Sequence, residues 1–154
     1  TLFHGPRAVF AAYQRGSYAA SSKLPPGMMI RLGTYGDPAA VPVKVWEDFL
    51  KGAAGWTGYT HQWRTIDAAT WAPLVMASVD SEAEMREAHA LAYRTFRVTS
   101  PGVGPIKGEE IVCPASAEAG KKTTCIDCKA CMGTSGKAKV SIQIVAHGTG
   151  KIHV

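Results

Sequence analysis

Four cysteines lie close together in the last third of this 154-residue chain. Cys113 is followed by Cys125, Cys128 and Cys131 within the segment "IVCPASAEAGKKTTCIDCKACMG", residues 111–133. Thiolates are ligands for zinc and for iron–sulfur clusters, and neighbouring thiols can also form disulfides. These residue types at this spacing therefore predict one of three structures: a disulfide, a zinc site or an iron–sulfur cluster.

The pattern Cys-x11-Cys-x2-Cys-x2-Cys favours a metal over a disulfide. Structural zinc usually recruits two separated Cys-x2-Cys pairs, whereas three cysteines at successive x2 spacing are typical of segments that hold iron–sulfur clusters. The chain opens without an apolar secretory signal, so we expect a reducing, cytoplasmic location where disulfides are rare. We predict an iron–sulfur cluster held by all four cysteines. Zinc bound by the four, or by three of them with His147, stays open as the alternative.

Lysines are concentrated around these cysteines. The net charge is +5, and residues 1–112 are close to neutral, whereas residues 113–154 contain six lysines and two carboxylates. Clustered lysines attract phosphate, which makes a zinc-stabilised nucleic-acid-binding module the alternative function; they would equally offset the negative charge of metal-bound thiolates. The lysines are Lys121, Lys122, Lys129, Lys137, Lys139 and Lys151.

Short apolar runs alternate with helical patterns along the chain, as in βαβ units that build a parallel sheet. We predict a single α/β domain over residues 1–154, folded as an incomplete, three-quarter β/α barrel or as an open doubly wound sheet. The cysteine-rich residues 113–133 would form a metal-binding loop within it. The expected strands are 27–36, 56–63, 72–80, 94–100, 109–115 and 139–148, and the expected helices are 5–16, 41–55 and 81–93.

Two further expectations follow from these elements. The helix at 5–16 has no strand before it in this sequence, so we expect a segment upstream that completes the sheet. The longest apolar run, residues 72–79, is far too short to span a bilayer, so we expect no membrane partner.

Polar side chains follow most of the predicted strands. The carboxyl ends of parallel strands share one edge of a sheet, where the active sites of α/β proteins gather. Helix capping explains Asp80 before Ser81 equally well, but it explains histidine and arginine poorly. We predict that five candidate catalytic residues face one pocket beside the metal: Asp37, His61, Arg64, Asp80 and Arg97.

Several stretches of the chain resemble an uncharacterised family of cysteine-rich proteins encoded by phages and prophages. They are "RLGTYGDPAAVP", "WTGYTHQWR", "LVMASVDS", "RTFRV", "CPAS" and "TTCIDCKACMG", followed by a strand ending in "HG". The resemblance covers nearly the whole chain. It implies a protein that acts inside a bacterial host cell and that has a cysteine-rich segment upstream of this sequence. For the nucleic-acid-binding alternative, it implies a role in phage replication or host takeover.

The order of the strands is also distantly similar to phage proteins with partial barrels of the radical S-adenosylmethionine type. This similarity implies that "GTYGDP" contacts the amine of S-adenosylmethionine through Gly33, Gly36 and Asp37. The Cys-x3-Cys-x2-Cys loop that defines the group does not occur in this sequence, so its residues do not support radical chemistry. The substrate, a small molecule or a nucleic acid, and the choice between an enzyme and a binding module stay open.

Overall fold

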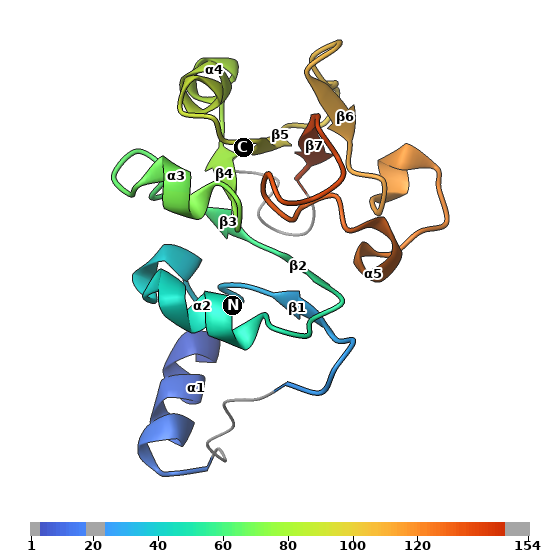
Figure 1. Cartoon of the computed structure of the whole chain (residues 1–154). Helices are drawn as coiled ribbons and strands as arrows, with labels where there is room; N and C mark the ends of the chain where they lie inside the picture. Colours follow the sequence, from blue (N-terminus) through green and yellow to red (C-terminus); the bar gives the residue numbers. More distant parts are fainter. Residues whose placement is uncertain (1–3, 18–23, 147–154) are drawn as a thin grey trace.

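The described part of the chain, residues 4–17 and 24–146 of a computed structural model, contains seven strands and five α-helices (Figure 1). The helices are α1 (His4–Gln14), α2 (Val43–Phe49), α3 (Ala68–Trp71), α4 (Glu82–Ala90) and α5 (Cys125–Cys128). The strands are β1 (Met29–Arg31), β2 (Gly55–Thr57), β3 (Tyr59–Thr60), β4 (Met76–Val79), β5 (Thr95–Thr99), β6 (Glu110–Val112) and β7 (Ser141–Val145). Short 3₁₀ turns occupy Pro38–Ala40 and Ala117–Ala119.

The strands form two parallel sheets that share one stretch of chain. β1 pairs with β2, and a five-stranded sheet has the order β3-β4-β5-β7-β6. Gly58 alone separates β2 from β3, so this stretch pairs with β1 at Thr57 opposite Arg31 and then with β4 at Tyr59 opposite Met76. The predicted α/β class with a mainly parallel sheet is confirmed. Over the described residues the sheet is open and does not close into a barrel.

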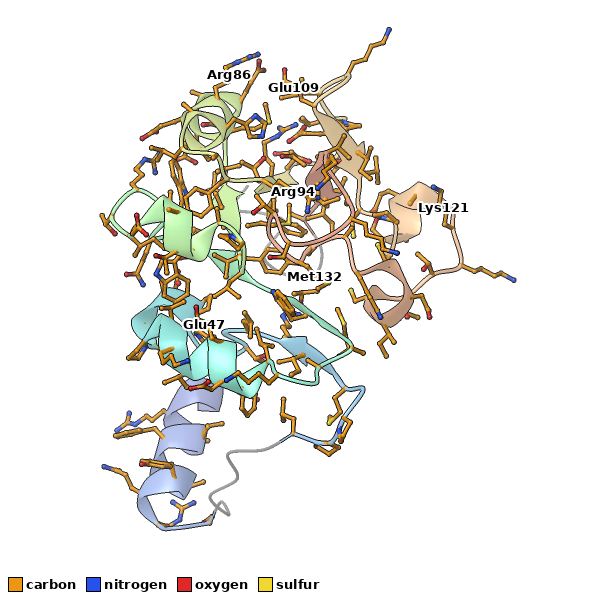
Figure 2. All side chains as sticks on the ribbon, in the orientation of Figure 1. Glu47, Arg86, Arg94, Glu109, Lys121 and Met132 are labelled. Carbon is orange, nitrogen blue, oxygen red and sulfur yellow. The ribbon has the colours of Figure 1, made fainter. Side chains whose placement is uncertain are left out.

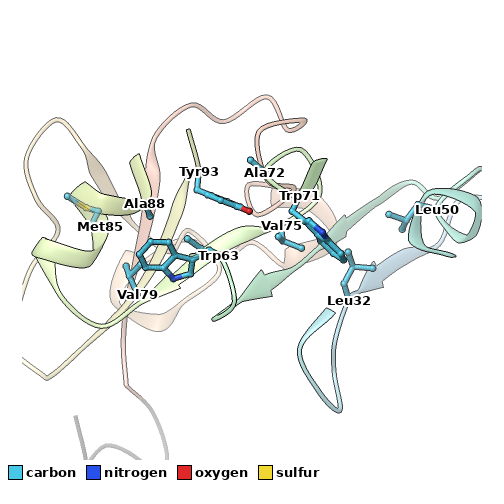
Figure 3. Packing of buried hydrophobic residues seen from close by; sticks show 11 residues of the cluster. Leu32, Leu50, Trp63, Trp71, Ala72, Val75, Val79, Met85, Ala88 and Tyr93 are labelled. Carbon is cyan, nitrogen blue, oxygen red and sulfur yellow. The ribbon is translucent and has the colours of Figure 1, made fainter. Parts of the chain in front are cut away.

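The two faces of the sheet are covered differently. Successive strand residues point to opposite faces, and on β4 Ala77 and Val79 join one apolar cluster whereas Met76 joins another. The first cluster packs against α3 and α4 through Trp71 and Met85 (Figure 3). All four residues of β4 are buried, which confirms the prediction of a strand covered on both faces.

The second face is covered by a segment that we call the cysteine loop, residues 125–133. Its residues Ala130 and Cys131 pack on Met76 and Ile142 of the sheet. α4, which follows β4, and the short α3 before it lie on one face, and the cysteine loop, which contains α5, lies on the other (Figure 1).

Local sequence signals explain where several elements begin. The Ser81 hydroxyl accepts a hydrogen bond from the backbone N–H of Glu84 at 3.2 Å, which caps α4 as predicted. The Glu84 carboxylate reaches back to the N–H of Asp80 at 2.9 Å. α1 matches the predicted helix at 5–16, but it projects from the rest of the described chain and exposes Phe10 and Tyr13 (Figure 1). No helix within the described ranges is long and apolar enough to cross a membrane.

Beneath the helix-covered face, β5 and β6 are joined by a buried ion pair. Arg97 donates from Nε to one Glu110 carboxylate oxygen at 2.8 Å and from Nη2 to the other at 2.5 Å, and both side chains are at most 7% exposed. The same carboxylate accepts the N–H of Ile106 at 2.9 Å. Burial alone would raise the pKa of Glu110, but the bonds from Arg97 and Ile106 outweigh it and hold that pKa below its ordinary value of 4.5.

We predict that Arg97→Met lowers the free energy of unfolding by about 3 kcal/mol or more, because it leaves a buried carboxylate without its counter-charge. Urea denaturation near neutral pH measures this loss. A carboxyl group with a lowered pKa stabilises the fold above its unfolded pKa, so the difference between wild type and variant should shrink as the pH falls below about 4.5.

Arg86→Met is the matched control, since Arg86 pairs with Glu82 and Glu109 at the exposed surface and its loss should change stability little. The account of the buried pair is wrong if Arg97→Met unfolds at the same urea concentration as Arg86→Met.

Candidate metal centre

A cavity of about 840 Å³ lies between the sheet and the cysteine loop. Its floor is the face of the sheet opposite α3 and α4. Phe96 and Val98 of β5 and Ile144 of β7 line it, together with Tyr59 of β3. These side chains occupy alternate positions of their strands, as the pleat requires. The cavity therefore results from the same alternation that buries the opposite face against the helices.

All four cysteines line this cavity, and all four are free thiols. Cys113 directly follows β6, and its N–H bonds to the Gln143 carbonyl at 2.8 Å, which continues the pairing of β6 with β7. Cys125 and Cys128 lie at the two ends of α5, and Cys131 is buried three residues further on. In the described ranges, no three His, Cys, Asp or Glu side chains already stand in a metal-binding group.

The turn that presents Cys125 and Cys128 is built by local signals. Residues three apart lie on one side of a helical turn, so the spacing places both thiols on the same side. The Thr124 hydroxyl donates to the Asp127 carboxylate at 2.7 Å at the start of the turn. Lys129 ends it in the left-handed conformation (φ 49°), and its Nζ donates to the Ala54 carbonyl at 2.9 Å. The chain is thereby redirected from α5 toward the sheet at Cys131.

Backbone contacts fix the far end of the cysteine loop. Thr134 donates its N–H to the Ala72 carbonyl at 2.8 Å, and Cys131 accepts the N–H of Gly58 at 3.4 Å. Gly133 adopts φ 55°, and a Cβ there would lie 2.4 Å from the Ala72 oxygen. Only glycine fits this position, because any side chain would meet backbone in a conformation that L residues disfavour.

Arg94, labelled in Figure 2, lies immediately before β5 and donates hydrogen bonds to the cysteine loop. Its Nη1 donates to the carbonyls of Ala130 and Gly133, each at 2.8 Å. Its Nε and Nη2 donate to the Val140 carbonyl at 3.1 and 2.5 Å. The residue is 7% exposed. One buried guanidinium thus satisfies three carbonyls on either side of the turn that leads from the loop into β7.

Burial controls the protonation of the two inner thiols. It raises the pKa of Cys131 to about 11, although a hydrogen bond from the Tyr59 hydroxyl and the charge of Arg94 lower it. Burial also raises the pKa of Cys113. Both residues are therefore protonated at neutral pH in the metal-free protein. Because metals bind thiolates, loading this site must release protons.

Of the five predicted catalytic residues, all of which the structure describes, His61 lines the cavity and the other four do not. Arg64 binds Glu84 and Glu87 at the surface and lies 3.9 Å over the Trp63 ring. Asp80 is exposed beside the cap of α4. Arg97 faces the opposite side of the sheet, where it is held by Glu110. The expectation that all five face one pocket is therefore wrong, and any catalytic role for them stays a prediction.

The turn predicted to bind a cofactor, residues 33–37, makes contacts that stabilise the fold. Asp37 accepts the N–H of Ala39 at 2.9 Å, the hydroxyl of Thr60 at 2.7 Å and the N–H of His61 at 2.8 Å. Its carboxylate therefore joins the turn after β1 to the end of β3. Gly33 has φ 67°, and a Cβ there would lie 2.4 Å from the Gly36 oxygen. Gly33, Gly36 and Asp37 lie outside the lining of the cavity.

Two other expectations concern the lysines around the cysteines and His147 as a zinc ligand. Lys121, Lys122, Lys137 and Lys139 are exposed, as a nucleic-acid patch requires, and such binding stays a prediction. Lys151 and His147, the alternative zinc ligand, lie outside the described residues.

Sequence reasoning counted Lys129 among the lysines that would offset thiolate charge, but it missed Arg94 and Tyr59 as residues that shape the site. Lys129 had a local signal, since it lies between two cysteines of the motif. Arg94 and Tyr59 act through residues 36 and 72 or more positions away, and no local pattern reports such contacts.

We predict that Arg94→Met lowers the free energy of unfolding by about 3 kcal/mol or more, because three buried carbonyls lose their donors. Chemical denaturation of the metal-free protein measures this, and faster hydrogen exchange at Ala130–Thr134 locates it. Lys137→Met, a change at an exposed lysine just beyond the loop, is the control. Unchanged stability and unchanged exchange in Arg94→Met would show that the loop does not depend on Arg94.

The comparisons with known proteins add no further assignment. A scan against protein-family models, a search of curated proteins and a search of solved structures each found no match.

Proposed function

We propose that the four cysteines hold an iron–sulfur cluster at one side of the cavity, in a partial β/α-barrel protein whose cavity receives a small molecule beside the cluster. The observation that supports this proposal most strongly is that all four thiols of the chain line the same cavity. They come from two separate parts of the chain, the end of β6 and the cysteine loop. Four cysteines are the usual ligand set of such clusters.

The size of the site favours a cluster over a single zinc ion. A structural zinc ion draws four thiolates to about 2.3 Å from one point. Here the cysteines line one part of a cavity of about 840 Å³, and in the described ranges no three of them already stand in a metal-binding group. A cluster of several iron and sulfide ions occupies more of such a space, and its corner irons can each take one of the separated thiolates.

The electrostatic surroundings also suit a group of negative overall charge. Four thiolates carry more negative charge than the iron core neutralises, and a cluster site therefore benefits from nearby cations and hydrogen-bond donors. Lys129 is within the loop itself, Arg94 lies behind it, and the Tyr59 hydroxyl acts to lower the pKa of the Cys131 thiol. No Asp or Glu is among the lining residues of the described cavity.

The architecture supports an enzyme-like arrangement. α3 and α4 lie on one face of the sheet, and the cavity lies on the other, as in a β/α barrel that has been opened along one side. Such a cavity is large enough for a small organic molecule. Bound there, a cluster would supply electron transfer or Lewis-acid chemistry next to that molecule, while the strands and Arg94 would hold the ligands in position.

We predict that protein purified without oxygen is brown and contains iron and acid-labile sulfide in equal amounts, about four of each per chain for a cubane cluster. Replacing Cys131 by serine should remove most of the colour and the iron, because an alkoxide is a poor substitute for a buried thiolate. Elemental analysis and the visible spectrum measure both quantities.

Ser135→Ala is the matched control, since Ser135 is exposed just past the cysteine loop and should leave the iron content unchanged. A colourless protein with one zinc ion per chain would show that the cysteines hold zinc and not a cluster. A protein that retains neither metal would contradict the proposed metal centre altogether.

A further inference from the structure

The cavity extends well beyond its cysteines, and the remaining walls differ from the metal side. The Tyr59 and Phe96 rings pack with their centroids 4.3 Å apart, and Val98 and Ile144 continue the same wall. Ligand pockets in proteins typically measure about 300–1,000 Å³ and are mostly apolar with a few polar groups. The cavity, at about 840 Å³, lies within that range.

Charged side chains in the lining are all cationic. Arg31 at the end of β1 and Lys129 in the cysteine loop line the cavity, as does His61, and no carboxylate of the described chain does so. Lys129 already donates to the Ala54 carbonyl. For the Arg31 side chain, no hydrogen bond or ion pair is formed with any described residue, and it is exposed at the cavity wall.

Arg31 lies outside the cysteine loop, at the end of β1 in the two-stranded sheet, whereas the cations beside the thiols contact or belong to that loop. Arg94 contacts the inner side of the cysteine loop, and Lys129 is part of the loop. Arg31 itself is the last residue of β1, in register with Thr57 of β2. A guanidinium that is unpaired in the described chain and set beside an apolar wall is suited to bind a carboxylate, sulfonate or phosphate in two-point contact.

We propose that the cavity binds a small organic anion with an aromatic or similarly flat apolar body. Its acidic group pairs with Arg31, and its body lies against Tyr59 and Phe96. The proposal depends on the proposed function only in placing this ligand next to a cluster. Recognition itself uses residues outside the cysteine loop, so it can be tested with or without metal.

Two related probes separate the two parts of this recognition. Anilinonaphthalene sulfonate carries an aromatic body and an anionic group, and phenylnaphthylamine has the same type of body without the charge. Both become fluorescent in apolar sites, so titration gives a dissociation constant for each. We expect wild-type protein to bind the sulfonate more tightly than the neutral amine.

Arg31→Gln should weaken sulfonate binding about tenfold, the value of one charge-assisted contact, and change the affinity for the neutral amine by no more than about twofold. Phe96→Leu should weaken both probes because it shortens the aromatic wall. Lys107→Gln, which removes an exposed cation on the loop before β6, should change neither. A cooperative unfolding transition like that of wild type excludes partly unfolded protein as the binding species.

The proposal is overturned if Arg31→Gln weakens both probes equally, or neither. Arg31 is not a metal ligand, so Arg31→Gln should keep the iron content of wild type. Protein that contains no iron but still discriminates the probes through Arg31 would contradict the cluster and support the anion site. Brown protein that does not discriminate the probes would support the cluster and contradict the anion site.

Discussion

The arrangement of the site depends on one buried arginine. Arg94 immediately precedes the central strand β5 and donates to the carbonyls of Ala130, Gly133 and Val140. Those carbonyls lie in a stretch with little regular secondary structure, where the backbone would otherwise leave polar groups unsatisfied beneath the surface. The guanidinium supplies the donors, and it thereby connects the sheet to the chain that presents Cys131.

This contact also explains how the part of the loop that carries Cys131 is held in place without metal. The far half of the cysteine loop is held by Arg94 and by the bond from the Thr134 N–H to the carbonyl of Ala72, the residue that ends α3. The near half, α5, is a single exposed turn held by fewer contacts, and Ile126 on it is 62% exposed. Cys113 and Cys131 thus lie on a firm base, while Cys125 and Cys128 are on the part best able to adjust to a bound cluster.

Much of the fold could be predicted from local patterns, because the forces behind it are local. The continuous apolar run before Asp80 predicts a strand buried on both faces, and Ser81 with Glu84 predicts the start of α4. α5 escaped prediction because four residues are too few to show helical periodicity. The turn at Asp37 offered only a capping signal, and its bonds to Thr60 and His61 come from a strand that follows much later.

The error over Arg97 has a clear physical cause. In "TFRVT", polar and apolar residues alternate, so the pattern fixes which residues share a face but not which face is the pocket. We expected the polar face to line the pocket. Glu110 of β6 reverses that choice, since it pairs with Arg97 beneath the opposite face and leaves Phe96 and Val98 to line the cavity. Arg97 and Glu110 belong to different strands, 13 residues apart in the sequence. The sequence of either strand alone does not show that they pair.

The central claim is that one cluster joins Cys113 to the three cysteines of the loop. X-ray absorption at the iron edge of the anaerobically purified chain tests this claim most directly. The account predicts iron surrounded by sulfur, with a second shell of neighbouring iron atoms, and loss of that iron shell in Cys113→Ser. Iron bound mainly by oxygen or nitrogen, or an iron shell that Cys113→Ser leaves intact, would contradict it.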